Sequence, residues 1–266
     1  MARSRLLAAA LALAWPLAAQ PDATEIIRRA AANAKSSLEL RLNYTFTRRT
    51  ETRHRDSSGN LKSTDIAISQ VVFLYGGFVD KPISFNGGAP TAKQIRAYNE
   101  TVAKVKSNPS GERARYRARQ LEEVDFIDEV RDAMRYRLLR EENSNGRAAF
   151  VIEGTPLPDY RPRTKGGKFL SKVKALIWVD QQDFHCIRVD ASVTEACAIG
   201  TAFAKVQPGS RVIMDQAPVS QGLWMPGRIE LKAEARILFF LGTTIDNTIT
   251  YSDYAPSQPA GGEAGR

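Results

Sequence analysis

Few residues of this chain have the types and spacing that catalysis or metal binding requires. The sequence holds two histidines, His54 and His185, and two cysteines, Cys186 and Cys197. They leave almost no ligands for a Cys₂His₂ or Cys₄ zinc site, an iron–sulfur cluster or a dense disulfide framework. His54 stands among charged residues near a predicted hairpin, and His185 alternates onto an apolar strand face. Neither histidine is therefore expected to act as a general base.

One group of acidic residues could supply paired carboxylates. Asp125, Asp128 and Glu129 are spaced so that they can meet on a helix, and two neighbouring carboxyl groups are what glycoside hydrolysis requires. A solvated acidic helix face is the simpler account of the same residues. The sequence contains no Gly-x-Ser-x-Gly elbow, His-Glu-x-x-His pair, phosphate loop or dinucleotide fingerprint. We therefore expect neither an enzyme nor a protein with a cofactor or metal.

The two cysteines leave two alternatives open. An oxidising compartment would permit a disulfide between Cys186 and Cys197. Whether their Cα atoms come within bridging distance depends on where the strand after Phe184 ends. Two small buried thiols are equally compatible with the sequence.

The first 19 residues have the layout of a secretory signal. Two arginines precede an apolar run from Leu6 to Trp15, and small residues follow before an expected cleavage at Gln20. The run is shorter than the about 20 residues that a membrane span needs. Residues 1–19 are therefore predicted to be a signal peptide, and the mature chain is predicted to be periplasmic or otherwise exported.

Composition narrows the class of protein. The chain has 266 residues, 43% of them hydrophobic, with 38 basic and 29 acidic residues and a net charge of +9. These values exclude a disordered, collagen-like or polytopic membrane protein. A basic exported protein meets anionic lipid headgroups and glycans, whereas nucleic acid is not an expected partner outside the cytoplasm.

Two kinds of hydrophobic periodicity follow the expected cleavage site. Residues 21–38 predict a helix, because Asp22 can cap it, Glu25 completes a capping box and apolar residues recur at helical spacing. From Leu38 onward apolar and polar residues alternate through Phe46, which predicts a long strand with one buried face. Further strands are expected near residues 62–75, 81–85, 136–140, 148–152, 171–180, 184–193, 201–206, 211–215, 229–239 and 245–251.

Helices are expected to interrupt these strands over residues 91–137. Thr91 can cap the first helix, and Asn108-Pro109 ends it. Arginines at two-residue spacing open the second helix and scatter around it: Arg113, Arg115, Arg117 and Arg119. They fit a solvated helix paired with glutamates, or a contact with anionic lipid or glycan.

This order of elements predicts an α+β, mostly β fold. We expect a strongly curved antiparallel sheet, an incomplete barrel, with helices packed in its concave face. No linker divides the chain, so residues 20–254 are expected to form a single half-barrel domain with the helical insert at about 91–137. Residues 255–266 are rich in Pro, Gly and Ser and predict a disordered tail.

The order of short motifs resembles that of an uncharacterised family of exported bacterial proteins, over nearly the whole mature chain. The motifs are Tyr44-Thr45-Phe46, Asp56 to Gly59, Asn86-Gly87-Gly88-Ala89-Pro90, Asn145-Gly146-Arg147-Ala148, Thr155-Pro156, Tyr160-Arg161-Pro162, Leu176-Ile177-Trp178-Val179-Asp180, Pro208-Gly209-Ser210, Trp224-Met225-Pro226 and Tyr251-Ser252-Asp253-Tyr254. That family in turn is similar to the outer-membrane lipoprotein-sorting superfamily of LolA, LolB and RseB-like proteins. The resemblance implies an incomplete barrel whose helices cover an apolar concave cavity that accepts acyl chains.

The site implied by the resemblance is apolar and contains no catalytic group. Burial of an acyl chain there would contribute about 0.8 kcal/mol per CH₂. The same residues could instead pack on the helices as a filled core, and Trp178 and Trp224 also fit ordinary core positions. The expected lining residues are Leu40, Leu42, Tyr44, Phe46, Trp178, Trp224, Ile229, Leu231, Ile237 and Phe239.

Two functions of different classes are therefore compatible with the sequence. The first is a periplasmic carrier or chaperone that binds the acyl chain of a lipid or lipoprotein and has an open apolar cavity. The second is an envelope module that senses or holds a protein partner, with a filled core and an exposed apolar patch or unpaired strand edge. An anionic membrane surface is a further candidate partner, and a monomer is expected.

Overall fold

The computed structural model describes residues 21–56, 58–74, 77–144, 146–198, 204–237 and 243–257. Some predictions concern residues outside these ranges. They include the signal peptide at 1–19, the first three residues of the strand expected at 201–206, the lining residue Phe239 and the part of the predicted tail at 258–266.

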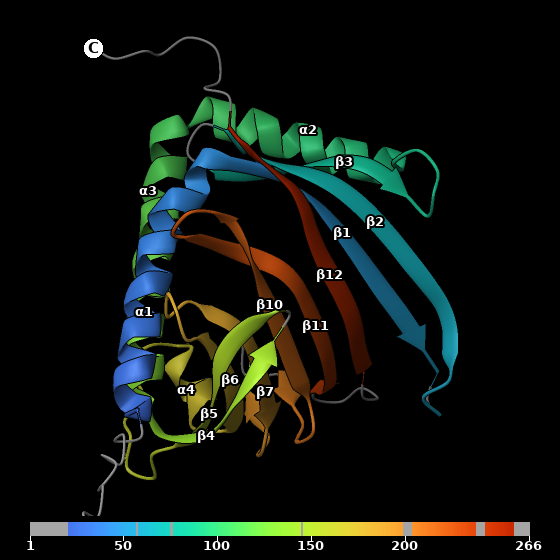
Figure 1. The fold of residues 1–266 in the computed structure, drawn as a ribbon. Coiled ribbons are helices and arrows are strands. Elements are labelled where there is room, and N and C mark those ends of the chain that lie inside the picture. Colours follow the sequence, from blue (N-terminus) through green and yellow to red (C-terminus); the bar gives the residue numbers. More distant parts are fainter. Residues whose placement is uncertain are drawn as a thin grey trace, which may run out of the picture.

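Strands make up most of the described chain and form one antiparallel sheet (Figure 1). Its main path has the order β3-β2-β1-β12-β11-β10-β7-β6-β5-β4, with the short strands β8 and β9 pairing beside β11. The strands are β1 (Tyr44–Arg55), β2 (Leu61–Leu74), β3 (Gly77–Phe85), β4 (Met134–Ser144), β5 (Arg147–Pro156), β6 (Val173–Asp180), β7 (Cys186–Val193), β8 (Cys197–Ala198), β9 (Ala204–Val206), β10 (Arg211–Ser220), β11 (Leu223–Ile237) and β12 (Thr243–Pro256). The sheet curves strongly without closing, which confirms the predicted α+β half-barrel.

The helices are α1 (Ala23–Leu40), α2 (Ala92–Ser107), α3 (Pro109–Ala133) and the single turn α4 (Gly167–Leu170). Helices α1 and α2 begin at the capping residues that the sequence indicated, whereas α3 begins at Pro109, four residues before the arginine run expected to open it. The backbone N–H of Thr24 donates to the Asp22 carboxylate at 3.0 Å, and Thr91 and Gln94 form a reciprocal capping box. The amide oxygen of Asn108 accepts from the N–H of Gly111 at 3.0 Å, which caps α3 behind Pro109.

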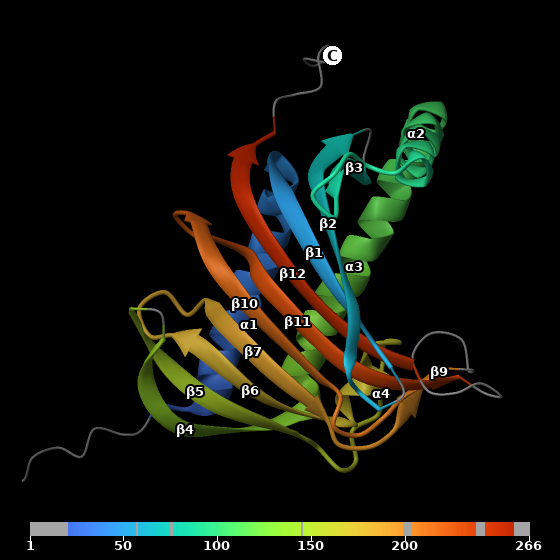
Figure 2. The ribbon, with the colours of Figure 1, turned by 90° about the vertical axis from the view of Figure 1, so that its right-hand side faces the viewer.

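Helices α1 and α3 lie side by side across the open side of the sheet (Figures 1 and 2). Lys35 of α1 pairs with Asp128 of α3 at 2.8 Å, and Arg41 pairs with Glu123. At one end of the sheet the Tyr116 ring of α3 meets Phe78 of β3, with ring centroids 5.9 Å apart. At the other end α1 packs on β5 and β6. The helix pair therefore spans the two ends of the sheet, while α2 runs along β3 (Figure 1).

The two faces of the sheet form separate cores at its β4–β7 end. Phe150 and Ile152 of β5 face α1 and pack against its Ile26 and Ile27. The alternate residues of the same strand point to the opposite face, because successive strand residues alternate. There Ala149 and Val151 pack with Trp178, Ile187 and Trp224. We call the face toward α1 the inner face and the opposite one the outer face.

The strand predicted to begin at Leu38 is wrong over its first six residues. Helix α1 continues through Leu40, a 3₁₀ turn spans Arg41–Asn43, and β1 begins at Tyr44. Leu, Glu and Arg are good helix formers and no breaker interrupts them, so the helical conformation continues where the apolar pattern suggested a strand. Burial of Leu38 and the ion pair of Arg41 with α3 stabilise this helical end.

The ends of β5 and β12 differ from their predicted positions by only a few residues. Strand β5 runs on through Thr155 and Pro156, the first residues of the segment expected to cross the surface as an extended chain. Pro156 pairs with Met134 at the very end of its strand, where proline interrupts little of the ladder. Strand β12 continues to Pro256, two residues past the expected domain boundary at residue 254.

Candidate ligand-binding site

A row of paired residues crosses the inner face of the sheet from one end toward the other. Cross-strand partners point to the same side, so the register alone defines the row. From β5 to β1 the directly paired residues are Ile152, Ile177, Val189, Met214, Ile229, Ile249 and Thr50. Ile152 and Ile177 belong to the core beneath α1, which identifies the whole row as the inner face.

Helix α1 covers only one end of this row of residues. Ile152 and Ile177 are buried beneath α1. Farther along, the apolar residues of β10, β11 and β12 are only half-buried. We call this half-exposed set the inner apolar patch; it consists of Val212, Met214, Ile229, Leu231, Ile245 and Ile249. A half-exposed apolar set on a concave face is a surface that can bind an apolar chain.

The inner face becomes polar next to this patch. Asn247 of β12 stands between Leu231 and Thr52, and its buried side-chain oxygen has no hydrogen-bond partner among the described residues. Farther along the same face, Arg48 of β1 lies four residues from Thr52, opposite Tyr251, and forms an ion pair with Asp80 of β3 at 2.9 Å. An occupant of this face would therefore meet apolar side chains on β10–β12 and hydrogen-bonding groups on β12 and β1.

Aromatic rings close the inner face at its β1–β3 end. The Phe46 ring contacts Phe78, Tyr251 and Tyr254 with centroids 6.2, 5.8 and 5.3 Å apart. Phe78 in turn contacts Tyr116 of α3. The Tyr254 hydroxyl donates to the carbonyl of Pro226 at 2.6 Å, and burial raises the pKa of this tyrosine. These contacts fix β1, β12 and α3 to one another.

The structure places the predicted lining residues in different environments. Phe46, Ile229 and Leu231 lie half-buried on the inner face. Leu40 lies at the end of α1 with 43% of its surface exposed, and Leu42 lies in the 3₁₀ turn. The Tyr44 hydroxyl is 3.4 Å from the Ser220 hydroxyl, at the hairpin between β10 and β11. For Ile237 the structure describes only the backbone, within β11.

Trp178 and Trp224 do not line the inner face, so this part of the prediction needs correction. Both belong to the cluster with Ala149 and Val151, on the side opposite to α1. The Trp224 ring stacks on His185 with centroids 5.7 Å apart. The strand and the apolar character of Trp178 were recognised correctly, but alternation does not say which of the two faces is concave.

The two cysteines are free thiols in this structure. Cys186 begins β7 and packs near the core under α1, whereas Cys197 packs with Val193 and Val173 at the other end of that strand. Burial raises the pKa of the Cys186 thiol to about 12 and also raises the pKa of Cys197. Of the two alternatives left open by the sequence, free thiols therefore describe them and a disulfide does not.

The candidate catalytic acids do not face a common space. Glu129 is fully buried and accepts hydrogen bonds from Tyr160, Arg163 and Thr164. Burial opposes its ionisation, but these donors outweigh burial and hold the pKa of Glu129 below its usual value. Asp128 instead pairs with Lys35. A carboxylate so held organises the loop after β5 and does not have the raised pKa of a general acid.

The two histidines also have structural partners. The His54 ring lies 2.9 Å from the Asp65 carboxylate at an exposed hairpin. The His185 ring stacks on Trp224, and burial there lowers the pKa of His185. Within the described ranges, no three His, Cys, Asp or Glu side chains are grouped so that they could hold a metal ion. No helix among those residues is long and apolar enough to cross a membrane.

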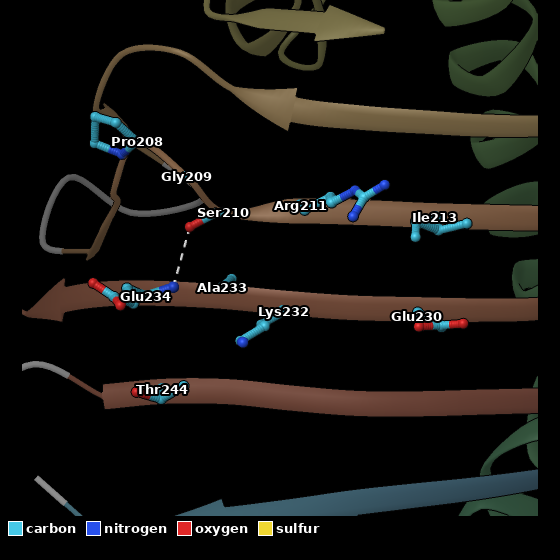
Figure 3. Close-up of a pocket in the computed structure, with 10 residues that line it drawn as sticks. All are labelled: Pro208, Gly209, Ser210, Arg211, Ile213, Glu230, Lys232, Ala233, Glu234 and Thr244. Carbon is cyan, nitrogen blue, oxygen red and sulfur yellow. Dashed lines mark hydrogen bonds between the residues drawn. The ribbon is translucent and has the colours of Figure 1, made fainter. Parts of the chain in front are cut away.

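Two hollows lie away from the inner apolar patch. One, of about 360 Å³, opens on the outer side of β10–β12 and is lined by charged and small residues (Figure 3). Within it the backbone N–H of Glu234 donates to the Ser210 hydroxyl at 3.1 Å. The other, of about 470 Å³, is a groove between α1 and α3. Neither hollow is lined by a residue that the sequence predicted for the ligand site.

The outer face above β1 and β12 is organised by ion pairs. Asp246 is buried and pairs with Arg53 at 3.0 Å and with Arg55 at 2.6 Å. Burial opposes ionisation of Asp246, but the two guanidinium groups hold its pKa below the usual value. The sheet thus carries charge on one face and the inner apolar patch on the other, which defines an open half-barrel whose concave side is the candidate binding surface.

Comparisons with known proteins find similar folds. No family model and no curated protein matches the chain. A domain from Vibrio parahaemolyticus, assigned as an outer membrane lipoprotein-sorting protein, is 12% identical, with a TM-score of 0.35 over 89% of this chain and 95% of that one. A DUF1329 family protein from Desulfovibrio piger is 12% identical, with a TM-score of 0.34 over 91% and 95%. A LolA superfamily protein from Nitrosomonas europaea is 13% identical, with a TM-score of 0.30 over 90% and 95%.

Proposed function

We propose that this protein is a carrier or chaperone that binds the acyl chain of a lipid or lipoprotein on the inner face of its sheet. One observation carries the proposal: the apolar row that α1 buries at β5 and β6 continues, only half-buried, as the inner apolar patch. Each CH₂ group placed against this patch would contribute about 0.8 kcal/mol. The function needs no catalytic residue, cofactor or metal.

The polar neighbours of the patch support an amphipathic ligand. The unpartnered oxygen of Asn247 is able to accept a hydrogen bond from a ligand, and Arg48 can attract an anionic oxygen beside its partner Asp80. An acyl chain over β10 and β11 would therefore carry its head group toward β12 and β1. The leader-like pattern of residues 1–19 supports export of the carrier, and we propose that it acts as a monomer.

Native mass spectrometry tests the proposal directly. The protein is exported to a bacterial periplasm and purified without detergent, and its bound material is then extracted with solvent. We expect a discrete mass excess that resolves into acyl lipid. Met214→Glu and Leu231→Glu should each abolish this excess, because a buried carboxylate would oppose the acyl chain.

A neighbouring residue provides the matched control. Ile213 is adjacent to Met214 and also half-buried, but it faces outward opposite Glu230. Ile213→Glu should therefore keep the lipid, with circular dichroism confirming that all variants are folded. A clean ligand-free mass for the wild-type protein would contradict the proposal, and so would equal retention of lipid by Met214→Glu and Ile213→Glu.

A protein-interaction module remains the second candidate, because the sheet has edges. Within the described part of the chain, β3 and β4 each pair on one side only, and each exposes a large apolar residue, Ile83 and Leu139. Such an edge can accept a strand from another protein. This function would be favoured by a ligand-free mass together with binding that Leu139→Lys removes.

A further inference from the structure

Most of the net charge of this protein lies in one short stretch. Residues 92–121, which form α2 and the first half of α3, contain eight basic and two acidic residues, a net charge of +6 in a chain of net +9. The two helices meet at Asn108 and form a corner at one end of the molecule, beside β3 (Figures 1 and 2). We call residues 92–121 the basic corner.

Seven of the eight cations of the basic corner have no ion-pair partner among the described residues. Arg115 pairs with Glu112. The other seven are exposed, and none forms an ion pair within the described ranges: Lys93, Arg96, Lys104, Lys106, Arg113, Arg117 and Arg119. By contrast, arginines of the sheet have ion-pair partners; Arg53 and Arg55, for example, both pair with Asp246. Uncompensated charge of one sign produces a positive potential that attracts anionic surfaces.

Each helix of the basic corner also exposes a large apolar side chain. Ile95 of α2 is 44% exposed, and Leu121 of α3 is 65% exposed. Arg113, Arg117 and Leu121 follow at intervals of four residues and therefore lie on one stripe of α3. Arg117 and Leu121 stand at the groove between α1 and α3. Cations beside exposed aliphatic residues are typical of helices that lie in a membrane interface.

We propose that the basic corner docks this protein onto an anionic phospholipid bilayer. Its cations would contact lipid phosphates, and Ile95 and Leu121 would enter the boundary between head groups and acyl chains. A nucleic acid fits less well, because single strands are bound by stacking of bases on exposed aromatic rings. The tyrosines of the corner, Tyr98 and Tyr116, are half-buried and buried.

Vesicle flotation tests this docking. The full chain is mixed with vesicles of phosphatidylcholine alone, or of phosphatidylcholine with about one quarter phosphatidylglycerol. We expect binding to the anionic vesicles that weakens in high salt. Because each basic residue at such a surface contributes about fivefold in affinity, Arg113→Glu with Arg117→Glu should weaken binding more than about tenfold. Leu121→Ser should weaken it without any change in charge.

A control double variant reverses two charges outside the basic corner. Lys62 and Lys174 are exposed and without ion pairs in the described chain, and both lie outside the basic corner. Lys62→Glu with Lys174→Glu changes the net charge equally and should keep most of the binding. Equal loss in both double variants would overturn the proposal, as would equal binding to neutral vesicles or preferential retention on RNA.

This test is independent of cargo binding. Met214→Glu alters the inner apolar patch and should leave flotation unchanged, whereas the arginine variants should keep any co-purified lipid. Failure of one experiment therefore leaves the other interpretable.

Discussion

At the scale of single residues, Asp180 shows how a buried charge is stabilised in this fold. It accepts hydrogen bonds from Arg147 at 2.5 Å and from the backbone N–H groups of Gln182 and Asp183 at 2.8 and 3.0 Å. Burial opposes ionisation, but these donors lower the pKa of Asp180 to about 2. The carboxylate therefore closes the turn between β6 and β7.

A depressed pKa has a definite consequence for acid stability. The stabilising contribution of Asp180 is present above about pH 4, near the pKa of the unfolded chain, and is lost as the pH falls toward 2. Its size is about 2 kcal/mol. We expect urea unfolding of Asp180→Asn to show lower stability at pH 7 than the wild type and a flatter decline between pH 4 and 2. Asp159→Asn, at an exposed carboxylate, should instead follow the wild-type curve.

Some residues of the concave face could be predicted from the alternation of apolar residues in the sequence, and others could not. Phe46, Ile229 and Leu231 were expected on the concave face and lie there. Val212, Met214 and Asn247 were not proposed for it, because their role follows from pairing of β10, β11 and β12 in one register. Trp178 was misplaced because both faces of its strand are buried, so hydrophobicity there carries no information on direction.

At the scale of elements, helix α1 has two halves with different roles. Ile26, Ile27 and Ala30 are buried on the sheet, whereas the C-terminal half lies beside α3. Ile27→Ala should lower the free energy of unfolding by about 2–4 kcal/mol, because it leaves a cavity over β5 and β6. Urea denaturation followed by circular dichroism measures this loss.

The exposed isoleucine of α2 supplies the comparison. Ile95→Ala removes the same atoms from a 44% exposed position and should change stability by less than about 0.5 kcal/mol. A similar loss in both variants would show that α1 does not cover a core at Ile27.

Element types were predictable where periodicity and caps agreed. The helices after Asp22 and Thr91 begin as expected, since their caps are local signals. The structure of the segment after Leu38 was not predictable in this way, because alternating apolar residues on a short helical end resemble a strand. Pairing between strands that are distant in the sequence could not be predicted from local signals. For example, β1 pairs with β12, and no turn in the sequence indicates this pairing.

At the scale of the whole molecule, the two ends of the sheet are held by different helices. Tyr116 of α3 contacts Phe73 and Phe78, with ring centroids 5.4 and 5.9 Å apart, while α1 covers β5 and β6. Tyr116→Ala should therefore raise the rate of amide hydrogen exchange in β2 and β3 more than about tenfold. Exchange in β5 and β6 should remain unchanged.

Tyr116→Phe separates ring contact from the rest of the side chain. It keeps both aromatic contacts and should leave the exchange pattern as in the wild type. A rise in exchange throughout the sheet for Tyr116→Ala would contradict independent cover of the two ends.

The pairing of β1 with β12 also determines when this protein can finish folding. Tyr44 lies opposite Pro256, so β1, which pairs early with β2, meets its second neighbour β12 only after residues 243–256 have been synthesised. Until then β1 and β11 each have one unpaired edge, because β1 pairs with β2 and β11 with β10. Closing a loop of this length makes their joining through β12 slow. A chain released before residue 243 would hold two separate half-sheets with open edges, which are the surfaces from which aggregation starts. The last strand to be made is therefore the one that joins the molecule together.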